Sequence, residues 1–173
     1  MVLYAQETNR TDIRTRPADV VANIMICLIY QANNLPEPTD YPEPGVVRKT
    51  DETRRTVVNV YSTTKGDVYV KRQCMHCNEP ACAAACLTQA MHKTKEGPVV
   101  WNGDKCMGCR YCMVSCPFDA PKFEYNSPNP EITKCTMCFE RQQEGKIPAC
   151  VENCPAEALK FGTRRELIAE ARK

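Results

Sequence analysis

Cysteines at short, regular intervals are the residues of this sequence best suited to chemistry. The segment CMGCRYCMVSCP, residues 106–117, holds four of them. Two related segments, CMHCNEPACAAAC and CTMCFERQQEGKIPACVENCP, share its order: a C-x-x-C step, a third cysteine, then three residues and a fourth cysteine. Thiols placed this closely on one local turn are typical ligands of a shared metal centre. The sequence therefore contains three candidate metal-binding motifs.

Disulfides, zinc and iron–sulfur clusters could all use such thiols. The chain has 13 cysteines, an odd number, and C-x-x-C steps suit a metal centre better than a closed disulfide framework. Structural zinc usually takes two C-x-x-C pairs separated by a longer loop. Residues 106–117 instead follow the pattern C-x₂-C-x₂-C-x₃-C-P, which is the iron–sulfur run of bacterial ferredoxins. We therefore expect [4Fe–4S] clusters.

The ligand sets follow from the ferredoxin rule that the fourth cysteine of a motif reaches the neighbouring cluster. Cluster A is expected to be held by Cys74, Cys77, Cys82 and Cys116, and cluster B by Cys106, Cys109, Cys112 and Cys86. The third motif offers Cys135, Cys138 and Cys150 to a third cluster, cluster C, which lacks a fourth ligand. Cys154 is a further candidate metal ligand, and the only cysteine outside the motifs is Cys27.

Short strands and helices are predicted around these motifs. Residues 56–73 alternate apolar and polar side chains on either side of KGD, which predicts a β-hairpin leading into the first motif. The segments GPVVWNGDK, APKFEY and ALKFGT, beginning at residues 97, 120 and 158, predict short strands. Thr163 and Glu166 form a capping box that predicts a terminal helix. This repetition predicts an α+β fold of tandem bacterial-ferredoxin-like units with short strands, short helices and long loops.

Three segments of the chain are expected to differ in role. Residues 1–73 form an N-terminal segment with a proline-rich surface loop at 33–55 and the hairpin. Residues 74–125 form the two-cluster ferredoxin unit. Residues 126–173 carry the third motif and the terminal helix, which we expect to pack with the N-terminal segment.

Composition and motif content exclude several functions. A formal net charge of +2 gives no reason to propose a nucleic-acid partner. The longest apolar run, residues 20–30, is about half the ~20 residues that a membrane helix needs, so no membrane span is expected. The N-terminus also lacks the features of a signal peptide in their usual order. Because no P-loop, dinucleotide fingerprint or Ser/His/Asp set is present, we expect a protein that is not itself an enzyme.

Over residues 69–173, the segments YVKRQCMHC, CMGCRYCMVSCPFDAPKFEY and CPAEALKFGTRRELIAEA resemble the four-cluster iron–sulfur subunits of membrane-bound respiratory oxidoreductases. This family includes electron-transfer subunits of dimethyl sulfoxide reductase, polysulfide reductase, formate dehydrogenase, uptake hydrogenase and quinone reductase complexes. The resemblance implies a relay of electrons between a catalytic subunit, of molybdopterin or hydrogenase type, and an integral membrane quinone-binding subunit. It also implies a membrane-associated complex, with the periplasmic side favoured. The alternative is a soluble polyferredoxin that shuttles electrons between enzymes.

The chain departs from that family at its N-terminus, where family members carry another cysteine motif. Residues 5–30 contain only Cys27. The family's pairing would make Cys27 the fourth ligand of cluster C, which gives three [4Fe–4S] clusters and leaves Cys154 as a buried thiol. Alternatively, Cys27 is a core cysteine. Cluster C is then [3Fe–4S], or it takes an oxygen or nitrogen ligand.

Basic residues and one histidine near the motifs have two possible roles. Lys105, Arg110, Lys122 and Lys134 would raise cluster potentials if they lie close to a cluster, and otherwise are ordinary solvated side chains. His76, inside the first motif, would be a non-cysteine ligand, a hydrogen-bond donor to cluster sulfur, or a loop residue.

Overall fold

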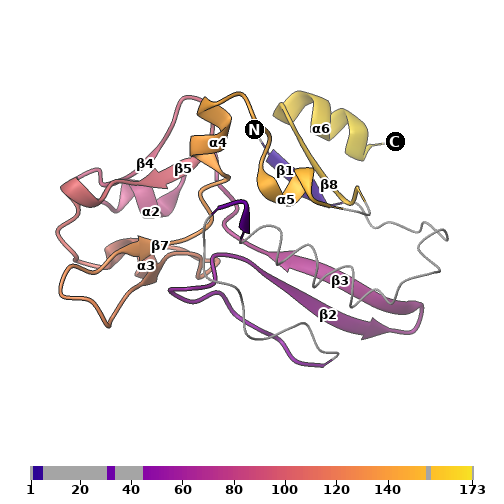
Figure 1. Cartoon of the computed structure of the whole chain (residues 1–173), viewed down its shortest axis with the longest axis horizontal. Helices are drawn as coiled ribbons and strands as arrows, with labels where there is room; N and C mark the ends of the chain where they lie inside the picture. Colours follow the sequence, from indigo (N-terminus) through magenta and orange to yellow (C-terminus); the bar gives the residue numbers. More distant parts are fainter. Residues whose placement is uncertain (1, 6–30, 34–44, 155–156, 173) are drawn as a thin grey trace. The chain divides into compact units, whose positions relative to one another are not determined.

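The computed structural model describes residues 2–5, 31–33, 45–154 and 157–172 (Figure 1). In this part of the chain the strands form four separate two-stranded antiparallel sheets. The helices are short, and among the described residues only α6 (Arg164–Ala171) reaches eight residues. Loops therefore carry most of the first and second cysteine motifs, as the spacing of their cysteines predicts.

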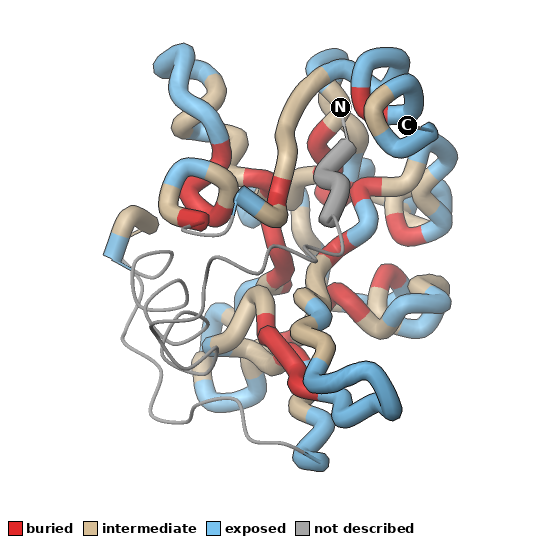
Figure 2. The backbone as a smooth tube through the Cα atoms, turned by 90° about the vertical axis from the view of Figure 1, so that its right-hand side faces the viewer, coloured by how far each residue is buried: buried red, intermediate tan, exposed pale blue. Residues whose placement is uncertain are grey.

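A β-hairpin precedes the first motif, which confirms the prediction for residues 56–73. Strands β2 (Val57–Thr63) and β3 (Gly66–Arg72) pair from Val57↔Arg72 to Thr63↔Gly66. The first four residues of β2 are buried, whereas the far end of the hairpin is exposed (Figure 2). Asn59 contributes to this burial by exchanging two hydrogen bonds with the backbone of Arg48, at 2.9 and 3.1 Å. The hairpin base is thus anchored to the end of the proline-rich segment.

The first two motifs alternate helices with short strands. Helix α2 (Ala81–Ala84) is followed by β4 (Met91–Lys93), β5 (Val99–Trp101) and the 3₁₀ helix η1 (Gly103–Lys105). Helix α3 (Tyr111–Val114) is followed by β6 (Lys122–Phe123) and β7 (Ile132–Thr133). Strand β4 pairs with β5 and β6 with β7. One core joins these elements, built from Met91, Val99, Phe123 and Ile132 with the thiols of Cys82 and Cys112.

The third motif is followed by the expected strand and helix. Helices α4 (Phe139–Gln143) and α5 (Ala149–Glu152) lead to β8 (Leu159–Gly162), which pairs with β1 (Val2–Ala5). The capping box that opens α6 is present: Thr163 Oγ1 accepts from Glu166 N at 3.3 Å, and Thr163 N donates to the Glu166 carboxylate at 3.0 Å. Buried Leu167 anchors this helix. The sequence prediction for residues 158–171 is therefore confirmed.

Two compact units make up the chain. One contains Lys49–Thr56 and Gln73–Phe139, and the other contains the described residues up to Arg48, Val57–Arg72 and those from Glu140 onward. Their limits differ from the three segments expected from the motifs, which remain a proposal about folding units. Among the residues that the structure describes, no helix has the length and apolar character needed to cross a membrane.

Candidate metal centres

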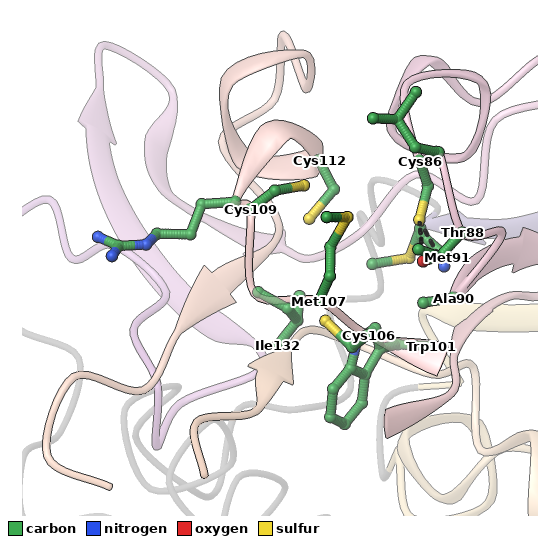
Figure 3. A pocket seen from close by; sticks show the side chains of 12 residues that line it. Cys86, Thr88, Ala90, Met91, Trp101, Cys106, Met107, Cys109, Cys112 and Ile132 are labelled. Carbon is green, nitrogen blue, oxygen red and sulfur yellow. Dashed lines mark hydrogen bonds between the residues drawn. The ribbon is translucent and has the colours of Figure 1, made fainter. Parts of the chain in front are cut away.

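One cavity is lined by all four thiols predicted for cluster B (Figure 3). Cys106, Cys109 and Cys112 come from the loop before α3 and from its first turn, and Cys86 comes from the segment after α2. The cavity measures about 350 Å³ including its open mouth, and Met91, Trp101 and Ile132 form part of its wall. The structure therefore brings Cys86 of the first motif to the three cysteines of the second.

The cluster B loop depends on backbone conformations that ordinary residues avoid. Gly108 and Arg110, on either side of Cys109, have φ values of 69° and 61°. Glycine adopts this left-handed region at no steric cost, but arginine does not. The Arg110 guanidinium lies 4.6 Å from the Phe123 ring centroid and 5.4 Å from that of Tyr125. These cation–π contacts offset the strain and tie the loop to β6.

Hydrogen bonds to sulfur prepare Cys86 for ligation. Its Sγ accepts the backbone N–H of Met91 at 3.3 Å and lies 3.7 Å from the Thr88 hydroxyl. Burial acts to raise the pKa of Cys86, but these hydrogen bonds outweigh it and lower the pKa below the usual thiol value. Because metals bind thiolates rather than thiols, Cys86 is suited to its predicted role.

The four thiols predicted for cluster A lie in the same unit and influence one another. Cys74, Ala120 and Cys135 of the third motif form a small buried core, against which Cys116 packs. Burial raises the pKa of Cys74 to about 11, with smaller contributions from the thiols of Cys135 in the third motif and of Cys82. Burial also raises the pKa of Cys82, with added contributions from Cys116 and Cys77. These influences indicate that Cys82 lies near each of the other three thiols.

The two four-thiol sites adjoin each other. Cys82 of cluster A and Cys112 of cluster B belong to the same buried core. Burial raises the pKa of Cys112 to about 11. Neighbouring thiols raise it further, with the largest contribution from Cys82 and smaller ones from the three other cluster B cysteines. The side chains of this core therefore form a wall that thiols of both sites share.

A backbone repeat extends to the third motif. Two positions have a positive φ in all three motifs. One is the residue before the second cysteine (His76, Gly108 and Met137), and the other is the third residue after the fourth cysteine (Gln89, Asp119 and Glu157). Each of the last three donates its N–H to the carbonyl of that fourth cysteine, at 3.0 to 3.2 Å. Cys154 therefore lies in the same turn that Cys86 and Cys116 adopt.

The third motif is divided between the two compact units, with Cys135 and Cys138 in one and Cys150 and Cys154 in the other. Cys135 Sγ accepts the N–H of Met137 at 3.4 Å. Cys150 is buried near the start of α5, and Cys154 is buried after its end. Cys27, the predicted fourth ligand of cluster C, lies outside the described residues. The ligand set of cluster C thus stays a prediction.

Basic residues near the motifs differ in their surroundings. Lys105 and Arg110 are exposed, and Lys122 pairs with Asp119 at 2.6 Å. Lys134 is only 3% exposed. The sequence did not predict a role for Lys93, whose ammonium donates to the carbonyls of His76 and Cys77 in the first motif. No sequence signal could have identified Lys93, because its position on β4 opposite Val99 is set by the pairing of β4 with β5.

Thiols make up the donor set of these sites. All 12 cysteines in the described part of the chain are free thiols. Four thiolates, one on each iron atom, complete a [4Fe–4S] cubane.

Residues 67–164 match the 4Fe–4S dicluster domain family. Among curated proteins, a Nitratidesulfovibrio vulgaris protein is 48% identical over 145 residues, which is 80% of this chain and 39% of the relative. Hydrogenase-2 operon protein HybA of Shigella flexneri is 48% identical over 126 residues, 70% of this chain and 38% of the relative. An anaerobic dimethyl sulfoxide reductase chain of Escherichia coli is 48% identical over 99 residues, 57% of this chain and 47% of the relative.

These similarities confirm four expectations from the sequence. The resemblance to iron–sulfur subunits of respiratory oxidoreductases is confirmed, as is the α+β ferredoxin-like fold class. The matched domain is of the electron-transfer type rather than the catalytic type, and its cofactors are [4Fe–4S] clusters. The chain spans about two fifths of the length of the first two of these relatives, and about half of the third.

Proposed function

Because this chain belongs to the 4Fe–4S dicluster domain family, we propose that it is the electron-transfer subunit of a respiratory oxidoreductase complex. Single electrons would pass through its clusters between a catalytic subunit and a membrane quinone-binding subunit. The observation that carries this proposal is the wall shared by the two four-thiol sites, where Cys82 and Cys112 lie in one core. Adjacent one-electron centres in a common apolar core are suited to relaying electrons rather than to binding a substrate.

The residues proposed to hold the clusters are those predicted from the motifs. Cluster A takes Cys74, Cys77, Cys82 and Cys116, and cluster B takes Cys106, Cys109, Cys112 and Cys86. The cavity that the cluster B thiols line supports the second set. Cluster C takes Cys135, Cys138 and Cys150 with Cys27, for a total of three clusters. Bound clusters supply one-electron redox chemistry, and the protein supplies thiolates, N–H donors and an apolar wall.

The catalytic partner is proposed to be of hydrogenase or molybdopterin type. The names of two relatives, a hydrogenase-2 operon protein and an anaerobic dimethyl sulfoxide reductase subunit, support such a partner. A membrane quinone-binding subunit would accept or donate electrons at the other end. We place the complex at the membrane, with the periplasmic side favoured, on the same family grounds.

Affinity purification tests this function. The tagged full-length chain is isolated anaerobically from detergent-solubilised membranes, and its co-purifying subunits are identified by mass spectrometry. We expect a catalytic oxidoreductase subunit and an integral membrane subunit. In the same preparation, substrate of the catalytic subunit should reduce the clusters, and a water-soluble quinone analogue should reoxidise them. Recovery of the chain alone, from the soluble fraction and with its clusters loaded, would instead identify a polyferredoxin shuttle.

A further inference from the structure

A buried lysine lies beside the cluster A thiols. Lys134 is 3% exposed, and its Nζ donates to the carbonyl oxygens of Val99 and of Cys135, the latter at 3.1 Å. In the described part of the chain no carboxylate lies within ion-pair distance of this ammonium. A buried charge without a partner is costly, so one expects an anion to face it. Burial raises the pKa of the Cys74 and Cys82 thiols, and the nearby Lys134 charge acts to lower both.

A second lysine approaches the same thiols from β4. The Nζ of half-buried Lys93 donates to the carbonyls of Cys77 and Gly97 at 2.8 Å and to that of His76 at 3.2 Å. Burial lowers the pKa of Lys93, and the thiols of Cys77 and Cys74 act in the opposite direction. As for Lys134, no described carboxylate pairs with it. All three of its hydrogen-bond partners are neutral carbonyls, so its charge is also uncompensated without an anion at cluster A.

His76 is held in a neutral form between the two lysines. Its Nδ1 accepts the backbone N–H of Val99 at 2.9 Å, and the carbonyl of the same Val99 accepts from Lys134. A peptide N–H can only donate, so Nδ1 carries a lone pair and the ring proton resides on Nε2. This excludes Nδ1 as a metal ligand. The imidazole contributes no net charge, and the positive charge near cluster A comes from the two lysines.

Among the residues that the structure describes, no such pair of buried cations is found at cluster B. The charges that act on its buried Cys112 are those of other thiols. The basic residues of its loop, Lys105 and Arg110, are exposed, and the Arg110 guanidinium lies over the rings of Phe123 and Tyr125. Solvent screens exposed charges far more than buried ones. The two neighbouring sites therefore differ in electrostatic environment, although their cysteine spacing is alike.

We propose that Lys134 and Lys93 are the fixed counter-ions of cluster A and hold its reduction potential above that of cluster B. The proposal rests on the ligand sets of the proposed function. On reduction one electron enters the cubane from the reductant, no bond breaks, and the cluster with its thiolates becomes one unit more negative. Two nearby ammonium groups stabilise this reduced form more than the oxidised form. Cluster A is then the site within the pair where an electron resides.

A redox titration of matched variants tests the proposal. The anaerobically purified full-length chain is titrated with dithionite, and each centre is followed by EPR spectroscopy. Lys134→Met keeps the apolar stem and removes the charge. Lys105→Met is the control, because Lys105 also directly precedes the first cysteine of a motif but is exposed. A neighbouring opposite charge typically shifts a proton equilibrium at least tenfold, and we expect a similar shift here.

The expected result is a fall of about tenfold or more in the reduction equilibrium constant of cluster A for Lys134→Met, about 59 mV for one electron. Cluster B should change less than about twofold, as should both clusters in Lys105→Met. An unchanged potential in an iron-loaded Lys134→Met protein would overturn the proposal. So would equal shifts of both centres.

A second variant covers the case in which Lys134→Met does not retain its iron. Lys93→Met should lower the potential of the same centre in the same direction, and its half-buried position makes it the milder change. If this iron-loaded variant leaves the potential of cluster A unchanged, the counter-ion proposal is wrong. Because the readout is a potential of the isolated chain, it does not depend on co-purifying subunits. Failure of the partner experiment and failure of this one are therefore distinguishable.

Discussion

Replacing Cys86 by serine tests the crossed ligation of clusters A and B most directly. Cys86 belongs to the first motif, yet its Sγ lines the cavity of the three cysteines of the second motif (Figure 3). Cys86→Ser should therefore damage cluster B and leave cluster A intact.

The size of the effect follows from the local contacts. Serine still presents an oxygen to the Met91 N–H, which donates to Cys86 Sγ at 3.3 Å, so the turn after α2 should persist. One of four thiolates is lost, and cluster B should lose one iron to give a three-iron centre, or lose all of its roughly four irons. The loss should not exceed those four, because the cluster A thiols keep their surroundings.

Anaerobic purification with iron counting and EPR spectroscopy of the reduced protein measures this outcome. Cys116→Ser is the reciprocal variant and should affect only cluster A, where Cys116 packs beside Cys74. Thr88→Val is the matched control, since the Thr88 hydroxyl lies 3.7 Å from Cys86 Sγ but is not a proposed ligand. It should retain the full iron content.

The double variant separates crossed from uncrossed ligation. Cys86→Ser together with Cys116→Ser should show both losses at once. The crossed arrangement is refuted if the two single variants abolish the same EPR signal. It is also refuted if Cys86→Ser removes cluster A, the centre that Cys116→Ser is expected to remove.

Four further outcomes are expected. The anaerobic chain should carry about twelve irons if three cubanes form, and about sixteen would show a fourth cluster. Cys27→Ala should convert cluster C to a three-iron form or abolish it while Cys154→Ala is silent; the reverse result in EPR spectra would assign Cys154 as the ligand. Thr163→Ala should destabilise α6 by about 1 kcal/mol, measured as faster hydrogen exchange in that helix. The reduced, iron-free protein should lose stability as pH rises from about 9 to 11 in urea titrations. This is because burial raises the pKa of Cys74 and Cys112 to about 11, so folding favours their protonated forms.

The local features of this protein were determined by its sequence. The three motifs, the hairpin at β2–β3, the strand at β8 and the capping box of α6 all follow from spacing over a few residues. Such features depend on short-range geometry, because a tight turn, a two-residue alternation or a first helical turn needs no distant partner. Cys27 lacks a local pattern of this kind, and its role therefore stays a prediction.

The surroundings of each site were decided only by the tertiary structure. Lys134 and Lys105 both precede the first cysteine of a motif, but one is buried and the other exposed. Lys93 reaches the first motif from a strand 16 residues beyond Cys77. Burial and long-range hydrogen bonds depend on which segments pack together, and the same dipeptide Lys-Cys can therefore carry a buried or a solvated charge. Cysteine spacing specified which residues could bind clusters, and packing determined the electrostatic environment of each cluster site.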